Sequence, residues 1–144
     1  MNDLAPYLLT ALIETPKRII YVSLGIHVGA RLDIMDLVHQ TTDYSSSKLQ
    51  LVLLTKALAR LNSDIVVTAV DPGWVPTKMG GRMATDDLTE GYMTQVWLAT
   101  LEDKSVSGNY FHHKKLSRYD QRADDEHLQN AYLQELASIT KVKI

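Results

Sequence analysis

Apolar residues recur along the chain with two spacings, and this pattern predicts helices and strands in turn. Residues 44–61 place apolar side chains around most of a helical circumference, as in a helix buried on two sides. Unbroken runs rich in β-branched residues at 18–23 and 65–70 are typical of strands covered on both faces. Further helices are expected at 6–14, 87–101 and 125–139, and a third strand is expected at 107–111.

The order of these elements indicates an α/β fold. Strands that alternate with helices imply a parallel sheet with right-handed crossovers, and doubly wound sheets usually have about six strands. We therefore expect a partial Rossmann-like fold, with about three parallel strands and flanking helices, that forms one domain over residues 1–144. The helix from Tyr44 to Leu61 would place one face on the sheet and the other on a second subunit, which predicts a homo-oligomer.

Composition narrows the class of protein. A chain of 144 residues suits one domain, and a net charge of -2 without a basic block leaves no patch for nucleic acid. The absence of cysteine excludes disulfides, and the five histidines lack the spacing typical of metal ligands. No apolar run reaches the length of a membrane span, and the first residues lack the basic region of a secretory signal. These features predict a cytoplasmic protein without a metal ion.

One pair of residues at the start of the longest helix is a candidate for catalysis. Tyr44 and Lys48 are four residues apart and therefore share one helical face. A phenol has a pKa of about 10, and a cation about 5 Å away favours its ionised form by roughly 3 kcal/mol. Lys48 would supply that cation, so that Tyr44 could exchange a proton with a substrate oxygen. The spacing alone is common, and its ordinary interpretation is a solvated lysine beside a half-buried tyrosine.

Five segments, in order, resemble the short-chain dehydrogenase/reductase family. They are the Asn-containing start at 2–10, the strand and loop at 18–25, Tyr-x-x-x-Lys at 44–48, Asp-Pro-Gly-x-Val-x-Thr at 71–77 and Ser-Gly-Asn-Tyr-Phe at 107–111. The resemblance implies hydride transfer between a nicotinamide cofactor, NAD or NADP, and a small alcohol or carbonyl substrate. It implies catalytic roles for Asn2, Ser23, Tyr44 and Lys48. It implies cofactor contacts from Tyr44, Lys48, Pro72, Gly73, Val75 and Thr77.

Two features depart from the family pattern. Family members usually read Ser-Ser-Gly at the catalytic serine, whereas this chain reads Ser23-Leu24-Gly25, so Leu24 stands at the catalytic position. Adjacent strand residues point to opposite faces, so Ser23 replaces that hydroxyl only after a rearrangement, and its ordinary interpretation is a buried hydroxyl bonded to backbone. Loss of one oriented donor costs about 10² to 10³ in rate. The Gly-rich phosphate loop is also absent, so the N-terminal nucleotide-binding half of the family domain is expected to be missing.

Two functions follow from this combination. In the first, the chain is an NAD(P)-dependent oxidoreductase of the family. In the second, it is a truncated, catalytically inactive homologue that serves as a binding or oligomerisation module through residues 44–61. The chain as given would be a fragment of a longer gene product, a mis-started enzyme, a degenerate paralogue or gene remnant, or an obligate partner of another chain. Binding of NAD(H) or NADP(H) by the isolated chain separates the two hypotheses.

Overall fold

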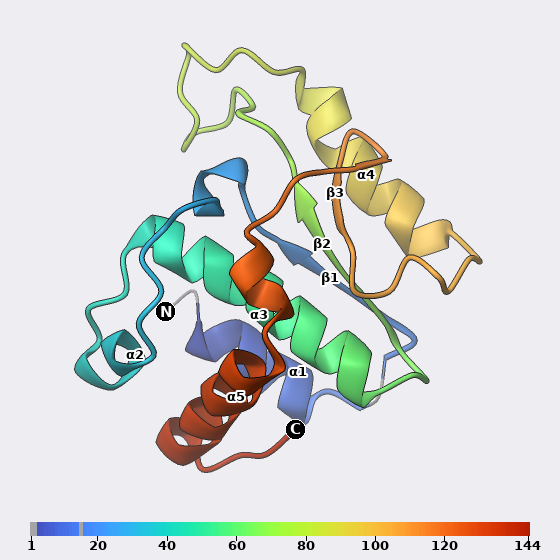
Figure 1. Ribbon diagram of the computed structural model, residues 1–144. Coiled ribbons are helices and arrows are strands. Elements are labelled where there is room, and N and C mark those ends of the chain that lie inside the picture. The colour runs from blue at the N-terminus through green and yellow to red at the C-terminus, as the bar shows by residue number, and fades with distance from the viewer. Residues whose placement is uncertain (1–2, 15) are drawn as a thin grey trace.

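The computed structural model describes residues 3–14 and 16–144, and a mixed sheet lies at its centre (Figure 1). The strands, in spatial order, are β1 (Arg18–Val22), β2 (Val66–Asp71), β3 (Tyr110–His112) and β4 (Lys115–Leu116). The first three are parallel, and β4 is antiparallel to β3. The predicted α/β, Rossmann-like arrangement is therefore confirmed.

The sheet differs from the prediction beyond β2. Three parallel strands were expected, but a short antiparallel strand, β4, follows β3, and β3 begins at Tyr110 rather than at 107. Residues 105–108 form a turn before β3, and the Gly108 amide donates to the Val67 carbonyl at 2.7 Å. His113 and Lys114 join β3 to β4 with φ values of 46° and 60°. Such tight hairpins need positive φ, usually supplied by Asn-Gly, and the sequence here lacks that signal.

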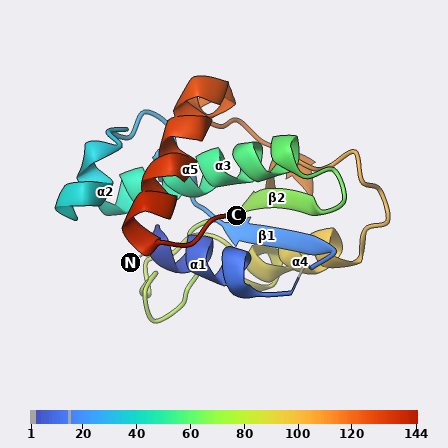
Figure 2. The ribbon, with the colours of Figure 1, turned by 90° about the horizontal axis from the view of Figure 1, so that it is seen from below.

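Helices cover both faces of the sheet. They are α1 (Leu4–Leu12), α2 (Met35–His39), α3 (Tyr44–Leu61), α4 (Leu88–Thr100) and α5 (Glu126–Thr140), with short 3₁₀ turns η1 (Gly25–His27) and η2 (Gln121–Asp124). Figure 2 shows α3 on one face and α4 on the other. The core on the α3 side is the larger, and a smaller core joins Val70, Leu98 and Phe111 on the α4 side.

The long helix α3 has the bounds that the sequence predicts. Asp43 caps it, because its side chain accepts a hydrogen bond from the Ser46 amide at 2.8 Å. Its apolar side chains from Leu49 to Leu58 are all buried within the chain, between the sheet on one side and α5 and η2 on the other. Contacts within one chain thus account for the apolar circumference. A homo-oligomer through this helix stays a prediction.

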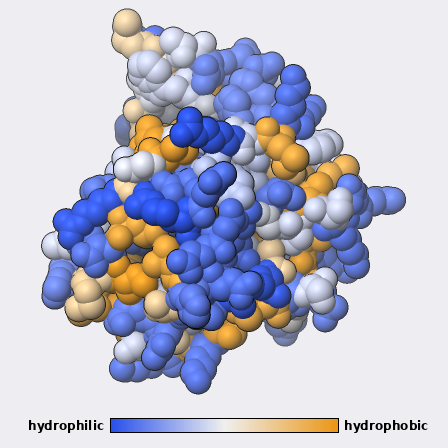
Figure 3. All heavy atoms as spheres, viewed as in Figure 1, coloured by the Kyte–Doolittle hydropathy of each residue, from blue (hydrophilic) through white to orange (hydrophobic). Residues whose placement is uncertain are grey.

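The surface of the molecule carries both hydrophilic and apolar side chains. On the face drawn in Figure 3, hydrophilic side chains surround separate apolar patches. Large apolar side chains that remain exposed include Trp74, Met79 and Met83 in the loop between β2 and α4. Within residues 3–14 and 16–144, every helix is too short or too polar to cross a membrane.

Candidate active site

A cavity of about 930 Å³ opens at the carboxyl ends of β1 and β2. Ligands of open α/β sheets bind at this edge of the sheet. Its lining comes from the end of β1 and the loop after it, the first turns of α3, the loop after β2, and the end of β3. Of the residues that the sequence predicts for the site, the cavity brings together Ser23, Tyr44, Lys48, Pro72, Gly73, Val75 and Thr77. The predicted Asn2 lies outside the described residues.

The predicted pair occupies one side of this cavity. Tyr44 is the first residue of α3, and its side chain is 44% exposed. The Lys48 Nζ atom lies 5.3 Å from the centroid of the Tyr44 ring and donates a hydrogen bond to the Val22 carbonyl at 2.9 Å. Burial lowers the pKa of Lys48 below its ordinary value. The end of β1 therefore holds this cation beside the phenol.

The hydroxyl of Ser23 is directed at backbone. The residue is 1% exposed, and its Oγ donates to the Lys48 carbonyl at 2.8 Å while its amide donates to the Val70 carbonyl at 2.8 Å. The next residue, Leu24, is extended and lines the cavity. This arrangement matches the expectation of a buried, backbone-bonded hydroxyl. A catalytic role for Ser23 stays a prediction.

The loop after β2 is built around Asp86, twelve residues downstream of Trp74 along the chain. The Asp86 carboxylate accepts a hydrogen bond from the Trp74 amide at 2.6 Å, and the Asp86 amide donates to the Trp74 carbonyl at 3.0 Å. Gly73 has a φ of 77°, and a Cβ at this position would clash with the Asp86 carboxylate. The Trp74 indole donates to the Gly80 carbonyl at 3.0 Å, which closes the loop.

Further residues at the cavity were missed by the motif analysis. His112 ends β3 and lines the cavity, and its Nδ1 lies 3.1 Å from the carbonyl oxygen of Asp71, its partner in register on β2. The rule that the carboxyl ends of parallel strands meet at one sheet edge could have found His112. Asp86 also lines the cavity, but it carries no motif that marks it in the sequence.

The residues of the cavity fit the nicotinamide end of a dinucleotide. An apolar lining with a few converging polar groups is typical of small-molecule sites. Apolar surface comes from Val22, Leu24, Ile26, Pro72, Val75 and Met79. The exposed Thr77 hydroxyl, which accepts from the Gly80 amide at 3.1 Å, has an O–H left to donate to a ligand such as a carboxamide.

Comparison with known proteins identifies relatives of this chain, although no protein-family model matches it. The short-chain dehydrogenase chyC of Penicillium rubens is 35% identical over 100% of this chain and 60% of the relative. The short-chain dehydrogenase chry4 of Gibberella zeae is 35% identical over 80% of this chain and 48% of the relative. Carbonyl reductase (NADPH) 1 of Oryctolagus cuniculus is 36% identical over 57% of this chain and 34% of that protein.

A solved structure supports the fold. The crystal structure of an uncharacterized protein from Mycobacterium paratuberculosis is similar with a TM-score of 0.71, at 20% identity, over 99% of this chain and 57% of that one. The fold and the site together define an α/β, Rossmann-like protein with a tyrosine–lysine pair at the carboxyl edge of its sheet. The chain belongs to the short-chain dehydrogenase/reductase family. It spans between about half and three fifths of the length of the two short-chain dehydrogenases.

Proposed function

We propose that this chain acts as an oxidoreductase that transfers hydride between NAD or NADP and a small alcohol or carbonyl compound. The observation that carries the proposal is the geometry of Tyr44 and Lys48, a phenol and a cation 5.3 Å from its ring centroid, in one cavity at the carboxyl edge of a parallel sheet. The names of the fungal and mammalian relatives support the same reaction class. The largely apolar lining favours a substrate with an apolar body.

Residues on two sides of the cavity would hold the cofactor. Pro72, Gly73, Val75 and Thr77 form the side after β2, and the pair on α3 forms the other. When bound, the nicotinamide ring supplies or accepts the hydride. The chain itself has to orient the substrate oxygen and to supply or take up the accompanying proton.

Tyr44 is the proton donor in the direction of carbonyl reduction. Its hydroxyl would give a proton to the substrate oxygen, and the phenolate that remains would face the fixed charge of Lys48. Because Lys48 is held by the Val22 carbonyl, its ammonium needs no reorganisation when the negative charge develops. In the oxidation direction the same phenolate would take the proton back.

The proposal is tested by nucleotide binding and by turnover in the same preparations. Wild-type protein should bind NADPH or NADH and oxidise it in the presence of an aldehyde or ketone. Tyr44→Phe should keep nucleotide binding and lose carbonyl-dependent oxidation, because it removes only the proton-bearing oxygen. Turnover that survives in Tyr44→Phe would overturn the assigned role, and absence of nucleotide binding by wild-type protein would overturn the proposal for this chain.

A second candidate function, an inactive binding module, is favoured by one observation. Leu24 occupies the position of the family's catalytic serine, and the neighbouring Ser23 hydroxyl is bonded to the Lys48 carbonyl. A protein of this kind would neither bind nor oxidise nicotinamide nucleotides and would assemble with a second copy. Sedimentation of the wild-type protein as a monomer would count against it, and nucleotide-dependent turnover would exclude it.

A further inference from the structure

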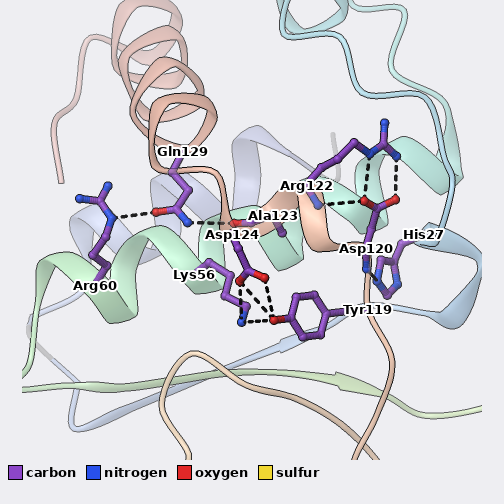
Figure 4. Close-up of polar contacts among 9 residues, drawn as sticks. All are labelled: His27, Lys56, Arg60, Tyr119, Asp120, Arg122, Ala123, Asp124 and Gln129. Atoms are coloured by element: carbon purple, nitrogen blue, oxygen red, sulfur yellow. Dashed lines mark hydrogen bonds and ion pairs between the residues drawn. The ribbon is translucent and has the colours of Figure 1, made fainter.

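A polar cluster outside the tyrosine–lysine pair joins the loop after β1 to the segment before α5 (Figure 4). At its centre is His27, which is 0% exposed. The His27 Nδ1 lies 2.8 Å from the Leu24 carbonyl oxygen, and the Asp120 amide donates to His27 Nε2 at 3.2 Å. A carbonyl can only accept and an amide N–H can only donate. The imidazole is therefore neutral, with its proton on Nδ1.

The segment before α5 also binds the loop after β1 at Gly29 and at Ala30. The Asp120 carboxylate accepts a hydrogen bond from the Gly29 amide at 2.9 Å and forms an ion pair with Arg122 at 2.7 Å. Arg122 Nη2 also donates to the Ala30 carbonyl at 2.6 Å. The bonds to Gly29, Ala30 and His27 join parts of the chain more than ninety residues apart. We call His27, Asp120 and Arg122 the clamp.

The clamp ends on the wall of the cavity. Leu24, Gly25 and Ile26 line the cavity directly, and the Leu24 carbonyl accepts from both Nδ1 and the backbone amide of His27. The Tyr110 ring of β3 also packs edge-on against the imidazole, with centroids 4.8 Å apart. Tyr110 of β3 and the Asp120 amide thus fix the imidazole. The hydrogen bonds of His27 to the Leu24 carbonyl in turn fix Leu24.

We propose that His27 is a positioning residue that fixes the cavity wall of Leu24, Gly25 and Ile26 by linking the Leu24 carbonyl to the Asp120 amide. The consequence for substrate and cofactor rests on the function proposed above, whereas the positioning itself does not. Protonation at Nε2 would set two N–H groups against each other and break the link to Asp120. Burial lowers the pKa of His27 and outweighs the hydrogen bond to the Leu24 carbonyl and the carboxylates of Asp120 and Asp71, which favour the charged ring.

Two substitutions of His27 separate its two hydrogen bonds. In His27→Gln, the amide oxygen falls near the place of Nε2 and can accept from the Asp120 amide, while the backbone amide of residue 27 still donates to the Leu24 carbonyl, so the connection from Leu24 to Asp120 is kept. In His27→Asn, the amide nitrogen falls near the place of Nδ1 and keeps only the local bond to Leu24. The readout is the methyl NMR spectrum of Leu24 and Ile26 in the 144-residue chain without nucleotide, which reports the wall directly.

We expect the wall signals to stay at their wild-type positions in His27→Gln and to shift or broaden in His27→Asn. In wild-type protein the same change should appear as His27 titrates in acid, and His27→Gln should not show it in that range. If loss of the link lowers the fraction of molecules with the wall in its fixed position to about one tenth, the apparent Kd for NADPH should rise about tenfold in His27→Asn. Gln129→Met is the control, because Gln129 is also buried and its side chain bonds Arg60 and Ala123 away from the cavity.

Three results would overturn the positioning role. They are wild-type wall signals in His27→Asn, equal changes in the two His27 variants, and unchanged wall signals while the wild-type imidazole titrates. A change in the Gln129 control as large as that in His27→Asn would count against the role in the same way. If both variants unfold, the wild-type titration alone decides. Because these spectra are recorded without nucleotide, they test the positioning role alone. Failure of the proposed function would appear in a separate measurement, as absence of NADPH binding by wild-type protein whose clamp is intact.

Discussion

The Lys48 ammonium donates a hydrogen bond to the Val22 carbonyl at 2.9 Å, and the Ser23 hydroxyl donates in return to the Lys48 carbonyl at 2.8 Å. These two bonds run in opposite directions between the end of β1 and the first turns of α3. They hold the ammonium 5.3 Å from the centroid of the Tyr44 ring. The strand end thereby determines where the charge of the candidate site lies.

Replacement of Lys48 by methionine should remove most of the proposed activity. Loss of a cation about 5 Å from the phenol withdraws roughly 3 kcal/mol of support for the phenolate, which corresponds to about 100-fold in rate. The measurement is carbonyl-dependent NADPH oxidation at saturating nucleotide, so that binding and turnover are separated.

The control for this substitution lies on the same helix. Lys56 Nζ lies 4.1 Å from the centroid of the Tyr119 ring and pairs with Asp124 at 3.0 Å, outside the cavity. Lys56→Met thus removes a lysine–tyrosine contact of the same kind without touching the site. Its turnover should stay within about twofold of wild type, and equal losses in the two variants would contradict the role given to Lys48.

Substitution of Leu24 by serine should increase turnover. The resemblance places Leu24 where family members carry the catalytic serine, and Leu24 lines the cavity, so Leu24→Ser should restore a donor toward the developing oxyanion. One oriented donor of this kind typically contributes about 10² to 10³ in rate. Leu24→Ala makes similar space without a hydroxyl, and a gain of the same size in both variants would assign the effect to cavity size.

The turn at Gly73 should not tolerate a side chain. Gly73→Ala adds a Cβ in the left-handed region, at φ 77°, where it meets the Asp86 carboxylate. Gly81→Ala adds one at φ 73° in open space, so it measures the backbone strain alone. We expect about 1–3 kcal/mol lower stability from strain in each variant, and a further loss in Gly73→Ala from displacement of Asp86. Urea denaturation measures both, and equal losses would show that Asp86 adjusts freely.

The sequence predicted those parts of the fold that depend on near neighbours. Residues 44–61 form a helix to the residue, because capping by Asp43 and the apolar spacing act within a few positions. The β3–β4 hairpin was missed, since His113 and Lys114 adopt positive φ without the usual turn residues.

The site shows the same division. Tyr44 and Lys48 were found from a local spacing, and the cavity residues of the loop after β2 from a resemblance confined to 71–77. Asp86 and the clamp were missed because they act through contacts between distant positions, such as His27 and Asp120, which are separated by 93 positions in the sequence. A single sequence gives no signal for a pairing of that range.

Alkaline pH should destabilise the fold through Tyr21. This side chain is 7% exposed in the core beside Thr10, and burial raises its pKa to about 12. Between pH 10 and 12 the folded state keeps this proton while the unfolded chain, with a tyrosine pKa of about 10, releases it. The unfolded state then binds fewer protons, so the free energy of unfolding falls as pH rises through this window. Tyr21→Phe removes this contribution, and its stability should decline less steeply in denaturant titrations at pH 9, 10 and 11. Parallel curves for the two proteins would show that Tyr21 ionises alike in both states.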